Sequence, residues 1–272
     1  MSVRLQHLTF RYPGADTDAV RDVSAAFDPG AVTLVTGRIG SGCSTLLLAM
    51  AGLAPHVTGG SRSGSVITLD HDPAEPEGRR ALAGRIGVLL PTPWTQLSGM
   101  SYTVFEEVAF GPANLGWERA KIGDAVHRSL QLVGMEHVVQ RDPRTLSGGE
   151  LQRVMFAAVA AMDPDVYLLD EPALELDPAG AQRLYELLPR LASDRTVVIA
   201  STDVDRAVDV VTRVLLLDCG AVIADGNPID VLGVSSAVER GCSTTIATIA
   251  HAAGAQMPYP LTVAAAIERV AG

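Results

Sequence analysis

Positive charge is scarce in this sequence, and lysine is almost absent from it. Lys121 is the only lysine among 272 residues, and 21 basic residues stand against 31 acidic ones, which gives a formal net charge of −10. Phosphate backbones are bound by clustered lysine and arginine side chains, so this acidic balance argues against a nucleic acid as the main partner. We attribute the shortage of lysine itself to compositional bias.

Cysteine and long apolar runs are also lacking. The three cysteines, Cys43, Cys219 and Cys242, are an odd number at wide spacing, which favours neither a disulfide framework nor a metal site. Reduced cysteines are typical of the cytosol. No uncharged apolar run reaches the roughly 18 residues that a membrane-spanning helix needs, and no signal-peptide pattern opens the chain. We therefore expect any role at a membrane to be peripheral.

The sequence does contain a regular alternation of apolar strands and helical segments. Its composition, 47% apolar and 19% charged, is typical of a globular protein. Short apolar runs predict buried strands, and apolar residues at helical spacing predict helices between them. Strands that alternate with helices indicate an α/β fold with a mostly parallel sheet. We expect strands at 3–12, 31–37, 166–172, 196–202 and 213–218, further strands at "VITLD" and "RIGVLL", and helical segments at 44–53, 93–145, 151–162 and 233–272.

A glycine-rich stretch between a predicted strand and a predicted helix, "GRIGSGCSTLL" at 37–47, nearly matches the phosphate-binding pattern G-x-x-x-x-G-K-[ST]. Backbone N–H groups of such a loop point at phosphate oxygens, and the Ser44 hydroxyl can bind Mg²⁺. Cys43 stands where the lysine is expected, and a neutral thiol cannot pair with the phosphates. A purely structural turn is the alternative. The candidate nucleotide-binding residues of the loop are Gly37, Arg38, Ile39, Gly40, Ser41, Gly42, Cys43, Ser44 and Thr45.

Two acidic residues end the apolar run "VYLLDEP" at 166–172. In phosphate-loop NTPases, an aspartate at this place holds Mg²⁺ and a following glutamate polarises the attacking water. We therefore take Asp170 as a magnesium ligand and Glu171 as the candidate catalytic base. Two acids that merely cap a strand are the alternative, and the phosphate loop upstream favours the functional interpretation.

A third motif, "LSGGELQR" at 146–153, resembles the signature of ABC-transporter ATPases. Ser147, Gly148 and Gly149 begin a predicted helix, where N–H groups can meet a phosphate. In that family two cassettes sandwich ATP, and each signature acts on the nucleotide held by the partner. The resemblance implies a P-loop NTPase ABC cassette: an α/β fold with a mostly parallel core sheet and flanking helices, an antiparallel β subdomain and an α-helical subdomain. It places the cassette at 1–232, its helical subdomain at about 93–150, and a C-terminal helical extension at 233–272.

Other segments resemble one branch of that family, the energy-coupling factor (ECF, or cobalt-type) importers. "TVFEEVAFGPANLG" (103–116) and "PLTVAAAIERV" (260–270) are similar to that branch, and "LTFRYPG" (8–14) resembles an adenine-stacking strand with Tyr12 as its platform. The resemblance implies ATP and Mg²⁺ as cofactors and a peripheral location at the cytoplasmic face of the cell membrane. It also implies three partners: a second ABC ATPase subunit, an integral membrane coupling subunit and a substrate-binding membrane subunit. The implied function is to couple ATP binding and hydrolysis to the import of a small solute.

Three positions of the chain's own nucleotide site depart from the family pattern. Besides Cys43, the Q-loop glutamine aligns with Pro91 and the switch histidine aligns with Thr202. Proline has no amide side chain, and threonine cannot present an imidazole to the γ-phosphate and water. The D-loop, "ALELD" at 173–177, carries larger side chains than usual. We therefore expect a weak or inactive site, although Glu171 is retained.

The signature, in contrast, is intact. This asymmetry suggests the degenerate half of a heterodimer, in which Ser147 and Gly149 complete the catalytic site of the partner. One alternative is a homodimeric ATPase that is active despite Cys43, with Glu171 as its base. Another is a non-catalytic scaffold that binds ATP. A soluble ABC protein of DNA repair or translation fits badly, because the chain is acidic and contains one cassette.

Overall fold

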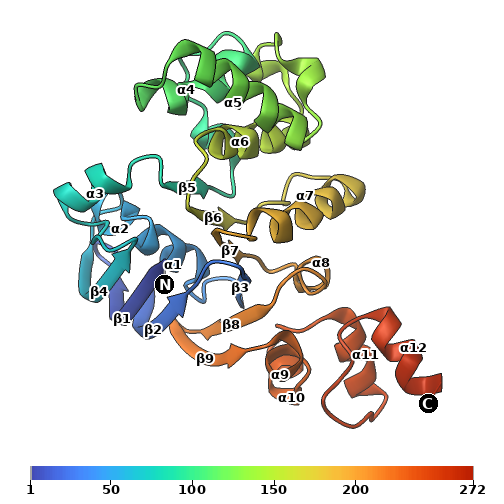
Figure 1. Cartoon of the computed structure of the whole chain (residues 1–272). Helices are drawn as coiled ribbons and strands as arrows, with labels where there is room; N and C mark the ends of the chain where they lie inside the picture. Colours follow the sequence, from blue (N-terminus) through green and yellow to red (C-terminus); the bar gives the residue numbers. More distant parts are fainter. Residues whose placement is uncertain (1, 272) are drawn as a thin grey trace.

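A six-stranded sheet forms the centre of the chain, of which the computed structural model describes residues 2–271 (Figure 1). The first five strands are parallel, and only the last pairs antiparallel with its neighbour. The predicted α/β class with a mostly parallel sheet is confirmed. The order across the sheet is β5 (Ile86–Leu89), β6 (Val166–Asp170), β7 (Thr196–Ala200), β3 (Val32–Gly37), β8 (Arg213–Asp218) and β9 (Ala221–Gly226).

The strands that carry the site are buried along their whole length. Every residue of β3, β6 and β7 is buried, which explains why these strands read as continuous apolar runs rather than alternating ones. Their burial comes from helices on both faces of the sheet. These are α1 (Cys43–Met50), which follows β3, and, on the other side, α7 (Pro178–Leu191) and the short α8 (Val204–Ala207).

A second, antiparallel sheet packs against α1. Its order is β2 (Val20–Phe27), β1 (Val3–Arg11) and β4 (Ser61–Thr68). Leu46, Leu47 and Met50 of α1 share one apolar cluster with residues of this sheet such as Phe10 and Val66. Two short helices, α2 (Leu53–His56) and α3 (Pro76–Leu82), lie on the same side of the molecule (Figure 1).

Three helices form a separate layer next to β5 and β6, on the side of the molecule away from the antiparallel sheet (Figure 1). They are α4 (Val104–Asn114), α5 (Arg119–Leu132) and α6 (Gly148–Ala161). The 3₁₀ turn η1 (Pro93–Gln96) precedes α4, and the turns η2 (Glu136–Val138) and η3 (Pro143–Thr145) lie between α5 and α6. Helix α6 begins three residues before the apolar pattern suggests, because Ser147 caps it and Glu150 completes a capping box. The expected boundary at residue 150 therefore falls inside α6.

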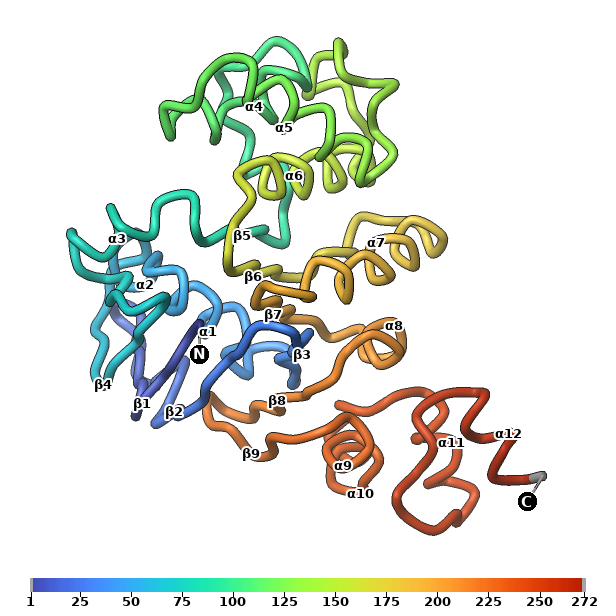
Figure 2. Tube along the Cα trace, viewed as in Figure 1, coloured from blue at the N-terminus to red at the C-terminus, as the bar shows by residue number. Residues whose placement is uncertain are grey.

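The last part of the chain is helical and lies beside β8 and β9, as the red end of the trace shows (Figure 2). It contains α9 (Pro228–Leu232), α10 (Ser235–Glu239), α11 (Thr245–Ala252) and α12 (Val263–Ala271), and the "MPYP" stretch lies between the last two. Thr245 donates two hydrogen bonds to the Asp205 carboxylate of α8, at 2.8 and 2.6 Å. Within residues 2–271, no helix has both the length and the apolar character needed to cross a bilayer.

Candidate functional site

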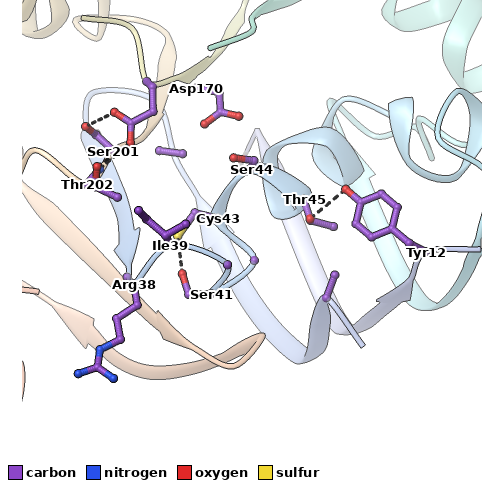
Figure 3. A pocket seen from close by; sticks show the side chains of 16 residues that line it. Tyr12, Arg38, Ile39, Ser41, Cys43, Ser44, Thr45, Asp170, Ser201 and Thr202 are labelled. Carbon is purple, nitrogen blue, oxygen red and sulfur yellow. Dashed lines mark hydrogen bonds between the residues drawn. The ribbon is translucent and has the colours of Figure 1, made fainter. Parts of the chain in front are cut away.

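A pocket of about 350 Å³ brings together predicted residues that are far apart in the sequence (Figure 3). The glycine loop forms its floor, Tyr12 stands at one end, and the chain after β6 and β7 closes the other. Three lining residues, Ala19, Ala200 and Ser201, were not predicted, because only the fold brings them beside the loop. The predicted residues that line the pocket are Tyr12, Gly37, Arg38, Ile39, Gly40, Ser41, Gly42, Cys43, Ser44, Thr45, Asp170, Glu171 and Thr202.

The glycines of the loop are required by its shape. Gly42 has φ of 102°, and a Cβ there would lie 2.2 Å from the Ala19 carbonyl oxygen. Gly42 also precedes α1 without any side-chain cap. Among the described residues, the N–H groups of Ser44 and Thr45 have no hydrogen-bond acceptor. Free N–H groups at a helix start form an anion site, so the backbone part of a phosphate cradle is present.

The residue at the lysine position carries no charge. The Cys43 sulfur lies 3.3 Å from the Ser41 hydroxyl oxygen. Burial raises the pKa of the Cys43 thiol to about 11, and the bond to Ser41 lowers it only in part. The thiol is therefore neutral at physiological pH and supplies no positive charge to stabilise a γ-phosphate.

Arg38 carries the only positive charge among the lining residues of this pocket, and it does not replace the lysine. Its guanidinium extends away from Cys43 (Figure 3). The Arg38 Nε donates a 2.9 Å hydrogen bond to the Arg240 carbonyl, which follows α10. The side chain of Arg240 is in turn 3.5 Å from the Asp218 carboxylate. The C-terminal helical segment thus holds the Arg38 guanidinium, the one cation among the lining residues, away from Cys43.

Ser44 and Asp170 provide the oxygen ligands that Mg²⁺ prefers. Asp170 is 5% exposed at the end of β6. Burial raises the pKa of its carboxyl to about 6, the Ser44 hydroxyl lowers it, and the charge of Glu171 raises it further. No group of three His, Cys, Asp or Glu side chains within residues 2–271 could hold a metal alone. These two residues therefore fit a magnesium ion that is shared with nucleotide phosphates.

Glu171, the candidate base, is restrained on both carboxylate oxygens. The Ser201 hydroxyl donates to its Oε2 at 2.8 Å, and Thr202 donates to its Oε1 from the backbone N–H at 2.8 Å and from the hydroxyl at 3.0 Å. Glu171 also adopts φ of 43°, the left-handed region that few non-glycine residues occupy. Thr202, at the position of the switch histidine, therefore restrains the Glu171 carboxylate by two hydrogen bonds.

Tyr12 lies at the far end of the pocket from Thr202 (Figure 3). Its hydroxyl oxygen is 3.1 Å from the Thr45 hydroxyl oxygen, and its ring meets Phe10 edge to face at 5.0 Å. These contacts fix the ring orientation at the mouth of the glycine loop. A role as the adenine platform remains a prediction.

The signature residues lie outside this pocket. Ser147, Gly148 and Gly149 line a separate hollow with Glu175, Leu176 and Asp177 of the D-loop. The Ser147 hydroxyl donates to the Glu150 carboxylate at 2.9 Å. A Cβ on Gly148 would lie 2.6 Å from a carboxylate oxygen of Glu175, so the D-loop sets a negative charge beside the start of α6.

Pro91, which aligns with the Q-loop glutamine, and the nearby Gln96 both lie outside the lining of the pocket at the glycine loop. Gln96 is held by the backbone after β5, since it accepts from the Leu90 N–H at 2.7 Å and donates to the Val88 carbonyl at 3.0 Å. Gln96 is therefore committed to shaping the loop and does not substitute for the glutamine missing at Pro91.

The thiol of Cys43 should alkylate slowly at pH 8. A pKa of about 11 leaves on the order of one thiolate per thousand molecules at that pH. We expect labelling by iodoacetamide, followed by mass spectrometry, to rise about tenfold per pH unit up to pH 10. Cys219, which is exposed, serves as the internal reference. Equal labelling rates of the two cysteines at pH 8 would contradict a buried, neutral Cys43.

Comparison with known proteins identifies the family. The ABC transporter family matches residues 20–174. Energy-coupling factor transporter ATP-binding protein EcfA of Carboxydothermus hydrogenoformans is 34% identical over 229 residues, which are 84% of this chain and 81% of that protein. The solved structure of cbiO1 from Clostridium perfringens, described as part of the ABC transporter complex cbiONQ, has a TM-score of 0.73 and 28% identity and covers 87% of this chain and 92% of that one.

Longer relatives also exist. An ABC transporter ATP-binding protein of Methanosarcina acetivorans is 38% identical over 232 residues, and these are 85% of this chain but only 37% of that protein. The chain thus spans well under half the length of that relative, so the activity of the complete relative is not assigned to this chain. The chain belongs to the ABC transporter family and contains its ATP-binding cassette.

Proposed function

We propose that this chain is the degenerate half of a heterodimeric pair of ABC cassettes, and that the pair energises the import of a small solute. The observation that carries this proposal is an asymmetry within one chain. The nucleotide pocket has a phosphate cradle but no cation directed into it, whereas the signature is complete and lies in another hollow.

Nucleotide binding is supported by the backbone of the loop. The N–H groups after Gly42 are oriented for an anion, and Ser44 with Asp170 would hold Mg²⁺ beside it. When bound, Mg²⁺ neutralises phosphate charge. Tyr12 would place the base at the other end of the pocket. The chain would therefore hold Mg²⁺-ATP weakly or statically.

Poor hydrolysis at this site is supported by three side chains. Cys43 is neutral, and Arg38 is hydrogen-bonded to the Arg240 carbonyl. Both carboxylate oxygens of Glu171 accept hydrogen bonds, from Ser201 and Thr202. Electrostatic stabilisation of the transition state is commonly the largest catalytic contribution, and loss of one oriented donor can cost about 10²- to 10³-fold in rate. A base that is held by three hydrogen bonds must also break them to reach water.

Work on the nucleotide of the partner is supported by the signature. Ser147, Gly148 and Gly149 form the start of α6, where the helix dipole and N–H groups attract phosphate. They are reachable from outside the chain, because their hollow is open and separate from the chain's own nucleotide pocket. This is the geometry that a signature acting on a partner cassette requires.

The ECF-type assignment is supported by relatives that carry such names. One is an energy-coupling factor transporter ATP-binding protein, and the other is described as part of the complex cbiONQ. For this chain we propose a second ABC ATPase subunit, an integral membrane coupling subunit and a substrate-binding membrane subunit as partners, at the cytoplasmic face of the membrane. Residues 1–232 would form the cassette and residues 233–272 its C-terminal extension.

The direct test is Mg²⁺-ATP hydrolysis by the purified chain alone and after mixing with the partner cassette. We expect almost no activity alone and clear activity on mixing. Cys43→Lys should restore little activity alone, because Pro91 and the tie between Thr202 and Glu171 remain. Strong hydrolysis by the unmixed wild-type chain would instead favour a homodimeric ATPase, which the retained Glu171 permits. No activity in either sample would favour an ATP-binding scaffold.

A further inference from the structure

A second cavity, of about 450 Å³, lies where α7 meets the helical layer. Figure 1 shows α7 just beneath α6. The end of α5 supplies one wall, α6 supplies Arg153, and α7 supplies the opposite wall from Gly180 to Arg190. We call this the α7 cleft. It shares no residue with the nucleotide pocket.

Three arginines line the α7 cleft: Arg153, Arg183 and Arg190. Within residues 2–271, none of them forms an ion pair with a carboxylate. Glu186 is the only acidic residue of the lining, and its carboxylate accepts a 2.9 Å hydrogen bond from Gln182. The lining of the cleft therefore has three positive charges against one negative charge, on a chain whose net charge is −10. Two of these arginines, Arg153 and Arg183, also line the signature hollow, whose acidic residues are Glu150, Glu175 and Asp177.

The positions of these arginines suit a single anion. Arg183 and Arg190 are seven residues apart on α7, so they project from the same face of the helix about 10 Å apart. Both are exposed, so their guanidinium groups are free to turn toward a ligand. Arg153 faces them from α6 and is half-buried.

The floor between the arginines is apolar. Val133 and Leu184 are buried, and Leu132 and Leu187 are half-buried. Pockets that bind small molecules combine an apolar lining with a few oriented polar groups, and typically measure about 300 to 1,000 Å³. The α7 cleft has both features.

We propose that the α7 cleft binds a small phosphate monoester that carries an apolar group. A phosphate monoester bears close to two negative charges and three acceptor oxygens, which matches the excess charge and the three guanidinium groups. A carboxylate has one charge and two oxygens, and would leave one arginine unmatched. The apolar group would cover the leucine and valine floor.

A ligand bound in the cleft would alter the contacts of the signature through Arg153. Arg153 and Arg183 line both the α7 cleft and the signature hollow, and of the two it is Arg153 whose Nε donates to the Gly149 carbonyl, at 3.3 Å. A phosphate in the cleft competes for the same guanidinium and loosens that bond. This second step rests on the proposed function, because the signature would act on the nucleotide of the partner.

The binding test uses phenyl phosphate as the probe and isothermal titration of the full chain, with Mg²⁺-ADP present to fill the nucleotide pocket. We expect saturable binding of one probe per chain. Arg183→Ala and Arg190→Ala should each weaken it about tenfold, since each removes a charge-assisted contact. Arg119→Ala, which removes an exposed arginine at the start of α5, is the matched control and should bind normally. Inorganic phosphate should bind about tenfold more weakly than phenyl phosphate.

Two results would overturn the site: no saturable binding, or binding that neither arginine variant changes. Both are read on the chain alone, so they are independent of the heterodimer proposal. The link to the signature is tested on the mixed cassettes. Phenyl phosphate should change their ATPase rate with wild-type chain but not with Arg190→Ala. An equal change with both chains would refute the route through the cleft.

Discussion

Ser147→Arg in this chain should abolish ATP hydrolysis by the assembled pair, with a loss of roughly 10²- to 10³-fold. Ser147 is exposed at the start of α6, and its hydroxyl and N–H group both bond to Glu150. An arginine there would fill the hollow above Gly148 and Gly149, where the γ-phosphate of the partner's nucleotide is expected. The measurement is the ATPase rate of the mixed cassettes at saturating Mg²⁺-ATP.

Ser147→Ala is the control for folding. Both variants lose the helix cap, which costs about 1 kcal/mol of stability. The alanine, however, leaves the hollow open. We expect Ser147→Ala to reduce the rate only about tenfold, as for the loss of one hydrogen bond. Equal losses in the two variants would mean that the cap, and not access to the signature, determines the rate.

The reciprocal variant shows which site works. Glu171→Gln in this chain removes its only candidate base, and we expect the rate of the assembled pair to change less than about twofold, because that site contributes little. If Glu171→Gln stopped hydrolysis while Ser147→Arg spared it, this chain would hold the catalytic site and the proposed asymmetry would be reversed.

Much of the lining of the pocket at the glycine loop could be predicted, because its residues lie at fixed offsets in short motifs. The loop at 37–45 and the acids at 170–171 follow buried strands of the parallel sheet, and the carboxyl ends of such strands meet at one edge. Thr202 follows a third such strand. The order of the motifs, each placed after a buried parallel strand, was therefore enough to predict that these segments lie close together.

Two strands, β2 and β9, were not predicted because their residues lack a regular apolar period. In β2, buried residues occur at positions 20, 23 and 27, because pairing with β1 shifts register twice, and so the alternation expected of a strand is lost. In β9, no residue is fully buried. Neither segment carries the apolar pattern by which a strand is recognised in a sequence.

The long-range ties of the site were equally invisible in the sequence. The bond from Arg38 to the Arg240 carbonyl joins residues 202 positions apart, and Ser201 reaches Glu171 only because β6 and β7 are neighbours. These ties change the interpretation of the site. The pocket does not merely lack a lysine and a histidine: its remaining cation, Arg38, and its candidate base, Glu171, are both hydrogen-bonded to other groups.

Asp170→Asn should stabilise the nucleotide-free chain at neutral pH. Asp170 is 5% exposed, and burial raises the pKa of its carboxyl from an ordinary 3.8 to about 6. Ionising it in the folded state therefore costs on the order of 3 kcal/mol above pH 7. Asparagine has nearly the same shape, carries no charge and can still accept from Ser44. We expect a melting temperature about 5 to 10 °C above wild type at pH 7.5.

The pH dependence of the stability gain in Asp170→Asn tests whether the buried charge of Asp170 is its cause. Because the pKa is higher in the folded chain, the folded state binds more protons between about pH 4 and 6, and wild-type stability falls as the pH rises through that window. The advantage of Asp170→Asn should therefore shrink to about a third at pH 4.5, whereas Asp124→Asn, an exposed control on α5, should show none at either pH. Mg²⁺-ATP should stabilise wild type more than Asp170→Asn, because the carboxylate would bind the metal. An advantage that is the same at pH 4.5 and 7.5 would show that the buried charge is not its source.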